Sequence, residues 1–553
     1  MGGATSEAAE LRRLLPLVFI ATTLLGATIT LGVQMPAREV RGRVLDFDGP
    51  VAGATLRLKG TSIATLSAAD GSFVLSNLAA RYPLRLAAWA EGYYIAGVDV
   101  FPWSGEVRLN LAPLPAEDNH HYAWIPPAPE DRSPLAEALI RAATSLAPHL
   151  PNALAQSILD GLPLACADCH QEIYAEWRSS AHASAAINPR LLNLYNGTDA
   201  QGRPQVPPGY RLDFPDSLGN CATCHAPAAG LRAPYLIDLN QLAGAEAQGV
   251  FCDYCHKIRQ IVLDPASGLP PEGMPGAMAA HLLRPPAPQQ IFFGSLDDVD
   301  RGSDSFSALQ ESSQLCAPCH SGSFWGVPVY TSYAEWLSSP YPALGVQCQN
   351  CHLAPSGMAN LAPGRGGLQR DPSQLAGHAL PGGSDPELLA RAAQLEADVH
   401  RQGDVLRVTV RVTNLGAGHH LPTDQPMRHL ILVVHTRDTQ GAPLAYLDRE
   451  VIPAWGGVYA GLPGKIFARI LLDRQSGQAP TAAYWRPSEV VSDNRIPAGQ
   501  SDVSSYEFRA PSRGEVIVEV SLIYRPVFAE LAEAKGWALR DTLLAHQQIR
   551  LAE

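Results

Sequence analysis

All ten cysteines of this 553-residue chain fall in five copies of one motif, C-x-x-C-H, and this constrains its fold more than any other feature. That motif is the pattern of covalent c-type haem attachment. The two thiols bond to the haem, and the adjacent histidine ligates its iron. Zinc sites and disulfides also use C-x-x-C, but neither explains a histidine after every copy. The sequence therefore predicts five haem c groups, held by Cys166, Cys169 and His170; Cys221, Cys224 and His225; Cys252, Cys255 and His256; Cys316, Cys319 and His320; and Cys348, Cys351 and His352.

Composition narrows the classes of partner that the chain can have. Its net charge is −12 at pH 7, whereas nucleic-acid-binding domains are as a rule basic. Haem propionates would add negative charge, which suits docking to a basic redox partner protein. Apolar residues make up 46% of the chain, and its length exceeds that of a usual single domain. We expect several domains, redox partner proteins and no nucleic acid.

The N-terminus predicts a membrane anchor. Residues 14–33 form a stretch of 20 residues without a charged side chain, directly after Arg12 and Arg13. As a helix, about 20 apolar residues cross the hydrocarbon core of a bilayer. A cleavable signal peptide is the alternative, but no clear cleavage site follows Val33. We expect residues 1–36 to be a cytoplasmic tip and an uncleaved transmembrane helix.

The haem motifs predict on which side of the membrane the rest of the chain lies. Haem is attached to c-type cytochromes outside the cytoplasm, so residues 34–553 are expected on the outer side. The predicted location is the cell membrane, with a single span and with the haem domains on the periplasmic or extracellular side.

Hydrophobic patterning divides the remaining chain into four parts. Residues 39–113 alternate apolar and polar side chains in short runs, which predicts a β-sandwich. Residues 114–162 read as a proline-rich connector and a helix, and residues 163–392 hold the five motifs among short helices and loops. Residues 393–553 return to strand patterns and predict a second β-sandwich. The predicted fold class is multidomain: a transmembrane helix, a β-sandwich, a mainly α and loop pentahaem domain, and a C-terminal β-sandwich.

The first sandwich carries a recognisable order of turn residues. The order is Gly42, Gly53, Asp70-Gly71-Ser72-Phe73 and Glu91-Gly92-Tyr93. By this order, residues 39–113 resemble a carboxypeptidase regulatory-like domain. In that family the domain is an accessory sandwich without catalytic residues. The resemblance implies a role in spacing or docking.

Stretches outside the five motifs resemble known multihaem cytochromes. Residues 173–182, 249–257 and 418–423 are similar to the cytochrome c-554 / hydroxylamine oxidoreductase-like superfamily. That resemblance implies bis-histidine haems packed closely as an electron path. Two departures separate the chain from the catalytic members. All five motifs end in histidine, where pentahaem nitrite reductase has a lysine at its active haem, and hydroxylamine oxidoreductase has eight haems. We predict no catalytic residue.

A bis-histidine haem needs a distal histidine from elsewhere in the chain. The resemblance implies His182, which follows the first motif in a Trp-x-x-Ser-x-His pattern, and His419 in a Gly-His-x-Leu-Pro-Thr pattern, with His420 as its rival. A Gly-rich loop after the last motif favours His378, and a position between the third and fourth motifs favours His281. No fifth ligand is evident, so one haem can be five-coordinate. Weaker alternatives are His120, His121, His149 and Met358.

These features predict a membrane-anchored pentahaem cytochrome that transfers single electrons between a membrane donor and a periplasmic or extracellular acceptor. One alternative is an oxidoreductase that acts on a small nitrogen or sulfur compound at an open haem. Another is a subunit of an extracellular cytochrome filament or respiratory complex. The count of low-spin against high-spin haems separates the first two hypotheses.

An acidic run, Asp297-Asp-Val-Asp300, lies between the third and fourth motifs. Such a run invites a calcium assignment, but it lacks the glycine and the distal glutamate of an EF-hand loop. We expect it to be a solvated acidic turn.

Overall fold

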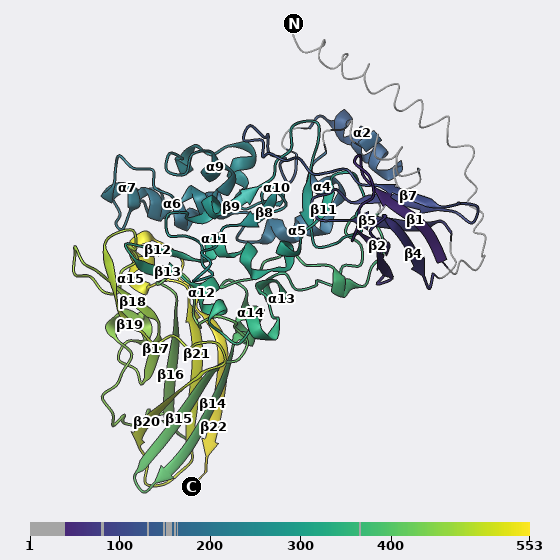
Figure 1. Ribbon diagram of the computed structural model, residues 1–553. Helices are drawn as coiled ribbons and strands as arrows, with labels where there is room; N and C mark the ends of the chain where they lie inside the picture. Colours follow the sequence, from purple (N-terminus) through teal and green to yellow (C-terminus); the bar gives the residue numbers. More distant parts are fainter. Residues whose placement is uncertain are drawn as a thin grey trace.

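The computed structural model describes most of the chain after residue 38, and three regions follow one another in it (Figure 1). A β-rich region and a second, longer one lie at opposite ends, with short helices and loops between them. The predicted anchor, residues 14–33, lies outside the described residues, and among those that are described no helix is long and apolar enough to cross a membrane. The described residues are 39–78, 82–129, 132–146, 150, 158–159, 162, 164–363 and 367–552.

The N-terminal sandwich consists of two sheets with one apolar core. The sheet orders are β4-β1-β7 and β3-β2-β5-β6. Strand β1 shows the expected alternation, since Val40 and Val44 are buried while Glu39, Arg41 and Arg43 face outward. The predicted strands of this region are confirmed. They are β1 (Glu39–Leu45), β2 (Thr55–Leu58), β3 (Ala64–Leu66), β4 (Ser72–Ser76), β5 (Leu84–Trp89), β6 (Ala96–Val100) and β7 (Val107–Asn110).

The middle region contains short helices and two-stranded sheets. Each C-x-x-C-H motif lies on one helical turn. Residues three and four positions apart lie on the same face of such a turn, so the second cysteine and the histidine stay beside the first cysteine. The helices are α2 (Pro134–Leu146), α4 (Cys166–Cys169), α5 (Gln171–Ser179), α6 (Pro189–Asn196), α7 (Tyr210–Asp213), α8 (Ala222–His225), α9 (Pro227–Arg232), α10 (Cys252–Cys255), α11 (Ala317–His320), α12 (Ser332–Leu337), α13 (Cys348–His352) and α14 (Pro386–Ala392). The strand pairs are β8 (Ile258–Ile261) with β9 (Ala280–Leu282), β10 (Phe292–Gly294) with β11 (Asp304–Phe306), and β12 (Gly322–Phe324) with β13 (Val327–Tyr330).

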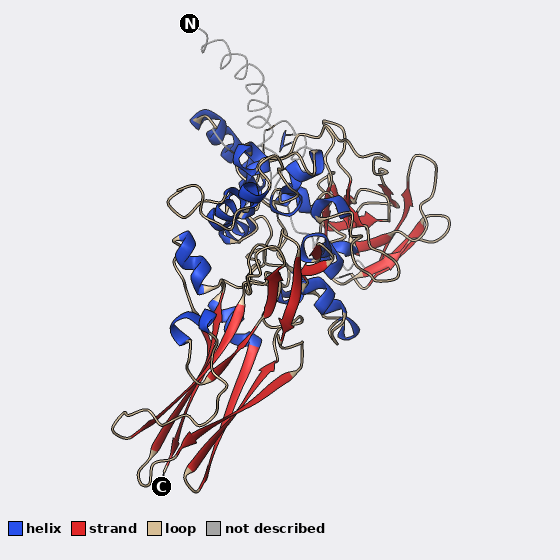
Figure 2. Cartoon of the chain, turned by 90° about the vertical axis from the view of Figure 1, so that its left-hand side faces the viewer, coloured by secondary structure: helices blue, strands red, loops and turns tan. Residues whose placement is uncertain are grey.

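Long strands form the C-terminal sandwich (Figure 2). Its sheets have the orders β14-β15-β20 and β17-β16-β21-β22, and they share one large apolar core. The structure confirms the three predicted strands, 404–413, 429–435 and 515–521. It also confirms the predicted helix near residues 526–535. The elements are β14 (Ala393–Gln402), β15 (Val405–Asn414), β16 (His429–Asp438), β17 (Gly464–Phe467), β18 (Arg469–Asp473), β19 (Ser488–Asp493), β20 (Ser501–Arg509), β21 (Val516–Arg525), α15 (Ala529–Lys535) and β22 (Thr542–Leu551).

The acidic run between β10 and β11 is not solvated, so that prediction is wrong. Asp298 is only 1% exposed and forms an ion pair with Arg370 at 2.6 Å. Its neighbours reach across to the N-terminal sandwich, where Asp297 pairs with Arg57 at 2.6 Å and Asp300 pairs with Lys59. Basic partners from two other parts of the chain bury these carboxylates. The run is therefore a docking element for the N-terminal sandwich.

Buried hydrogen bonds and an ion pair hold the C-terminal sandwich against the middle region. The ammonium group of Lys535, which ends α15, is fully buried and donates hydrogen bonds to the carbonyls of Asn193, Thr198 and Val206. On the other side, Glu335 of α12 forms a buried ion pair with Arg495 at 2.6 Å. These contacts fix the sandwich against the motif region.

Candidate haem-binding site

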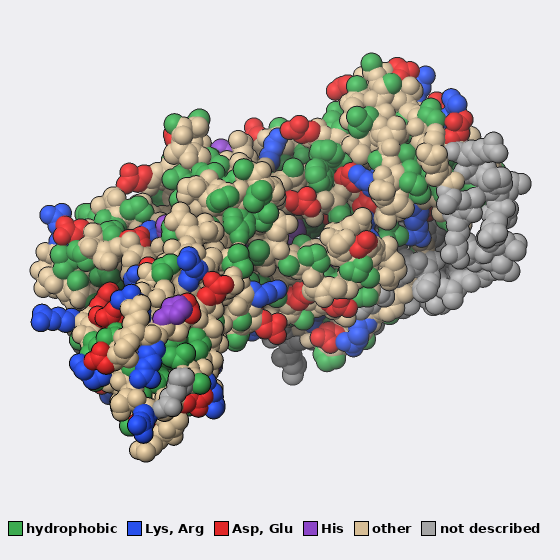
Figure 3. Space-filling view, turned by 90° about the horizontal axis from the view of Figure 1, so that it is seen from below, with side chains coloured by type: hydrophobic (Ala, Val, Ile, Leu, Met, Phe, Trp, Pro, Cys, Tyr) green, Lys and Arg blue, Asp and Glu red, His purple; other side chains and the backbone are tan. Residues whose placement is uncertain are grey.

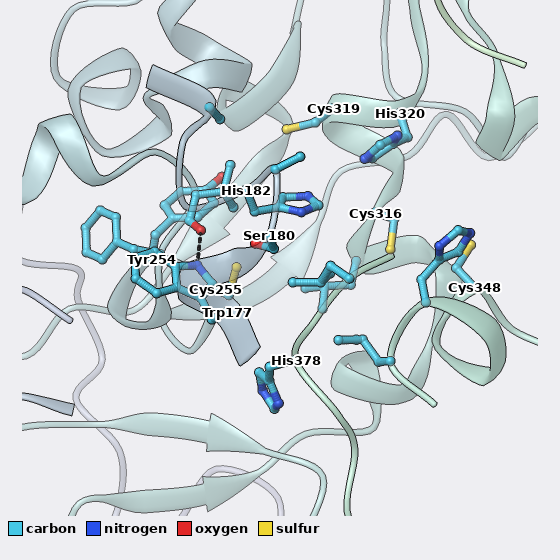
Figure 4. A pocket seen from close by; sticks show the side chains of 18 of the residues that line it. Trp177, Ser180, His182, Tyr254, Cys255, Cys316, Cys319, His320, Cys348 and His378 are labelled. Atoms are coloured by element: carbon cyan, nitrogen blue, oxygen red, sulfur yellow. Dashed lines mark hydrogen bonds between the residues drawn. The ribbon is translucent and has the colours of Figure 1, made fainter. Parts of the chain in front are cut away.

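A single cavity of about 2740 Å³ runs through the middle region and is lined by all ten cysteines and all five motif histidines. A pocket for one small ligand usually measures about 300–1,000 Å³. This cavity is several times larger, which suits several large cofactors. Motif residues from different helices converge on it in Figure 4.

The motif histidines are oriented as metal ligands. Each Nδ1 lies next to an oxygen that only accepts hydrogen bonds, so Nδ1 carries the proton and Nε2 is free to bind a metal. For the fourth motif the oxygen belongs to the Asp424 carboxylate, 3.3 Å from His320, and for the others it is a backbone carbonyl. These pairs are His170 with Leu361 at 2.9 Å, His225 with Ala185 at 3.3 Å, His256 with Phe293 at 2.7 Å and His352 with Pro381 at 2.7 Å.

Burial keeps most of these imidazoles neutral, as metal binding requires. It lowers the pKa of His170 to about 4 and also lowers the pKa of His225, His256 and His352. Burial lowers the pKa of His320 as well, but the hydrogen bond to Asp424 outweighs it and leaves that pKa raised. Asp424 is itself held by the backbone amides of Thr331 and Ser332. The residues present thus fit five haem groups.

Two predicted distal histidines face motif histidines across the cavity. The ring centroids of His182 and His320 are 6.3 Å apart, and those of His419 and His352 are 6.4 Å apart with an angle of 16° between the rings. Two metal–nitrogen bonds of about 2 Å on opposite sides of one ion, together with the two ring radii, give roughly this separation. The two pairs therefore have the spacing of bis-histidine ligation. Figure 4 shows the His182 and His320 rings close together near Cys316 and Cys319.

His378 also lines the cavity and lies near the third motif. Its backbone amide donates to the Glu176 carboxylate at 2.6 Å, and its Nδ1 lies 3.1 Å from the Ala376 carbonyl. Burial, followed by the influence of His256, lowers the pKa of His378 to about 4. His378 therefore lies near His256 in the cavity, and the Nε2 atom of His378 is available to bind a metal.

The other predicted ligands that the structure describes lie away from the cavity wall. His281 is exposed on β9, beside Gln260 of β8, so its position does not support the prediction of a distal ligand. His120 and His121 are exposed, and His420 lies 3.8 Å from Glu335. Met358 is buried outside the wall, and His149 lies outside the described residues. Among the described residues, no histidine from outside the motifs is in ring contact with His170 or His225.

Thiols of different motifs lie side by side, which spacing in the sequence does not reveal. Cys255 of the third motif interacts electrostatically with both cysteines of the fourth. Three further pairs of cysteines from different motifs lie close enough for their side chains to interact directly. They are Cys166 with Cys252, Cys224 with Cys319, and Cys316 with Cys348. The fourth motif thus lies near the second, third and fifth, and the first lies near the third.

Sequence reasoning missed several side chains on or near the cavity wall. Asp424, which orients His320, directly follows the Gly-His-x-Leu-Pro-Thr pattern, so that pattern could have drawn attention to it. The hydroxyls of Tyr330 and Tyr484 are 2.6 Å apart and come from different regions of the chain. No sequence signal joins these two tyrosines, because only the docking of the C-terminal sandwich brings them together.

Comparison with known proteins agrees with this geometry. Residues 165–257, which include the first three motifs, match the family described as "Cytochrome c554 and c-prime". The chain is a multihaem c-type cytochrome. A penta-heme cytochrome c552 from Thermochromatium tepidum has a similar fold, with a TM-score of 0.50 and 21% identity over 70% of this chain and 97% of that chain. No curated protein matches. The expected resemblance to cytochrome c-554 is confirmed for the matched segment.

Proposed function

We propose that this multihaem cytochrome carries five haem c groups and transfers single electrons between a donor and an acceptor protein. Bound haem iron supplies a one-electron couple whose potential depends on its ligands and surroundings. The observation that carries the proposal is the single cavity into which all five motifs project their cysteines and histidines. The chain's own residues hold the cofactors, orient the ligand nitrogens and exclude water.

The contacts between thiols support a connected path through the cavity. Each sulfur is the attachment point of a haem edge, so neighbouring sulfurs of different motifs bring the attached edges together. The path runs from the first motif through the third to the fourth, and from there to the second and the fifth. The fourth motif, Cys316–His320, is the branch point.

Kinetics of reduction test this path. In protein matured with a haem-ligation system, intact mass should show five covalent haems. Mixing with a one-electron reductant should then reduce all five in one phase, because electrons redistribute faster than they enter. Fewer than five haems in mature protein, or haems that reduce independently, would contradict the proposal.

A matched pair of variants tests the branch point. The Cys316→Ser/Cys319→Ser variant loses the fourth haem and should separate a slow phase for the second and fifth haems. The Cys348→Ser/Cys351→Ser variant loses only a terminal haem and should keep one phase. Equal behaviour of the two variants would contradict the branched path.

One observation favours a second candidate, an oxidoreductase for a small nitrogen or sulfur compound at an open haem. Among the described residues, no histidine from outside the motifs is in ring contact with His170 or His225, and the half-buried Tyr330–Tyr484 pair lies near Cys221 and Cys224. Phenol hydroxyls at such a place can donate hydrogen bonds to a small ligand. Binding of carbon monoxide by the reduced protein distinguishes the candidates, since a pure electron carrier with saturated irons binds none.

The place in the cell and the partners follow from the sequence as further parts of the proposal. The apolar residues 14–33 support a single-pass anchor in the cell membrane, with the haem region on the periplasmic or extracellular side. A membrane donor and an outer acceptor would be the redox partners, and membership of a filament or respiratory complex is the alternative. On the face seen in Figure 3, acidic and basic side chains are interspersed, so this face offers no single-sign docking patch. The β1–β7 sandwich would be a docking module of the carboxypeptidase regulatory-like kind.

A further inference from the structure

The N-terminal sandwich forms part of the wall of the haem cavity. Lys59, Arg85 and Gly97 line the cavity together with the segment 298–305 of the middle region. The two surfaces meet closely at Gly97, where a Cβ atom would lie 1.5 Å from a carboxylate oxygen of Asp300. The sandwich is thus a wall of the cavity as well as an accessory module.

Specific hydrogen bonds hold the sandwich in this place. The Ile95 amide donates to the Asp304 carbonyl at 2.9 Å, and the Trp89 indole donates to the Ser305 hydroxyl at 3.2 Å. The Ser305 hydroxyl in turn donates to the Tyr93 carbonyl at 2.8 Å. Because backbone groups and an indole ring take part, the position of β5 and its side chains is fixed relative to β11.

The compartment behind this wall belongs to the first motif and is rich in cations. Arg301 acts electrostatically on His170 and on both cysteines of that motif. Arg301 pairs with Asp304 at 2.6 Å, yet its side chain remains 44% exposed on the cavity wall. The same loop therefore presents a guanidinium group to the space where the first haem must lie.

Arg85 differs from the other cations of this wall in lacking a close carboxylate among the described residues. Lys59 and Arg370 form tight ion pairs with Asp300 and Asp298. The nearest carboxylate to Arg85 is that of Asp99 at 3.9 Å, and the Arg85 side chain is 42% exposed. A guanidinium group that lines the cavity and has so distant a partner can pair with an anion within that cavity.

We propose that Arg85, together with Arg301, binds the propionate carboxylates of the haem that is attached at Cys166 and Cys169. Haem carries two carboxylates on the ring edge away from its thioether bonds, and the planar fork of arginine matches a carboxylate in a bidentate way. The inference rests on the proposed haem occupancy of the first motif. It gives the N-terminal sandwich a defined role as a source of cofactor-binding charge.

The charge of Arg85 has a predictable effect on redox behaviour. A positive charge near a haem favours the reduced state, which carries one positive charge fewer than the oxidised state. Replacing Arg85 with a neutral side chain should therefore lower the midpoint potential of one haem. The other four haems should keep their potentials. Arg85 accepts a backbone hydrogen bond from Lys59, and the partner of Lys59, Asp300, directly precedes Arg301 beside the first motif.

Redox titration of the Arg85→Gln variant tests the inference. We expect about a tenfold shift in the reduction equilibrium of one haem, which is about 59 mV for a one-electron couple, toward lower potential. Arg85→Lys should restore most of the wild-type potential because it keeps the charge. Arg108→Gln is the matched control, since Arg108 is exposed on β7 of the same sandwich and does not line the cavity.

The same substitution in a protein without the first haem identifies which haem Arg85 affects. In a Cys166→Ser/Cys169→Ser protein, which lacks the first haem, Arg85→Gln should shift no potential. Unchanged potentials in the single Arg85→Gln variant, or a shift that persists in the protein without the first haem, would overturn the inference. Intact mass separates this failure from failure of the proposed function, because wild-type protein without haem at the first motif contradicts the function itself.

Discussion

The two β-sandwiches contribute to the haem cavity in different ways. The N-terminal sandwich docks through ion pairs such as Arg57 with Asp297, and it presents cations to the cavity. The C-terminal sandwich docks through buried groups such as Lys535, and it places the imidazole of His419 opposite that of His352. On our proposal, the N-terminal sandwich supplies charge near the haem of the first motif, and the C-terminal sandwich supplies a ligand to the haem of the fifth. Two domains of the same fold class can therefore contribute different groups to one cavity.

Loss of the ligand from the C-terminal sandwich should have the largest effect. The His419→Ala/His420→Ala double variant leaves His352 without an opposing imidazole, so one haem should change from low-spin to high-spin. EPR of the oxidised protein measures this change. His420→Ala alone should leave the spectrum unchanged, because His420 does not line the cavity. An unchanged spectrum in the double variant would contradict the role of this sandwich as a ligand donor.

Loss of the buried ion pair beneath the His419 loop should cost stability. Glu335 accepts hydrogen bonds from the His420 amide at 3.1 Å and the Thr423 hydroxyl at 2.5 Å, besides its pair with Arg495. Removing one partner of a buried pair costs about 3–5 kcal/mol. Glu335→Ala should therefore lower the free energy of unfolding of the C-terminal sandwich by about that amount, measured by chemical denaturation.

The matched control for that variant is an ion pair on the surface of the same sandwich. Arg407 and Glu507 lie 2.6 Å apart but are 47% and 32% exposed. Exposed pairs contribute about 0.2–1 kcal/mol. Arg407→Gln should remain within that range, and a loss as large as that of Glu335→Ala would refute the special role of the buried pair.

As the pH is lowered, the N-terminal sandwich should detach from the middle region at a higher pH than the C-terminal sandwich. Burial by itself would raise the pKa of Asp298, but hydrogen bonds from Arg370 and the Gly60 amide lower it below its ordinary value. A lowered pKa gives stability at neutral pH that is lost as the pH falls below about 4. The C-terminal sandwich has apolar packing and the proposed ligand His419 in addition to its carboxylates, so it should stay docked to lower pH.

Two backbone hydrogen bonds between domains can be used to measure which sandwich detaches first. The Ile95 amide donates to Asp304, and the Ala200 amide donates to Lys535 at 2.8 Å. Hydrogen exchange should show that protection of Ile95 is lost at higher pH than protection of Ala200. Simultaneous loss of protection at both amides would show that the two sandwiches do not differ in this way.

The sequence predicted the motif residues and the β-rich ends because their signals are local. C-x-x-C-H fits one helical turn, and alternation of apolar side chains marks strands such as β15. Three of the four predicted distal histidines reach the cavity, since recognisable local patterns surround them. For His281 the sequence offers only a place between two motifs, and the β8–β9 hairpin exposes it at the surface.

What could not be predicted depends on parts of the chain that are distant in sequence. The carbonyls that orient the motif histidines, such as that of Leu361, belong to residues of any type and leave no signal. The burial of the acidic run, residues 297–300, has no local signal because its basic partners, Arg57 and Arg370, come from other regions of the chain. The contacts between thiols of different motifs likewise arise only when the chain is folded.

The positions of the iron atoms test the central claim most directly. Anomalous diffraction at the iron edge, from crystals of the mature protein, locates each iron without reference to the haem ring. The account predicts five iron sites inside the cavity, three of them between paired imidazoles. The pairs are His378 with His256, His182 with His320, and His419 with His352. Fewer than five iron sites, or an iron bound to His320 with His182 turned away from it, would contradict the account.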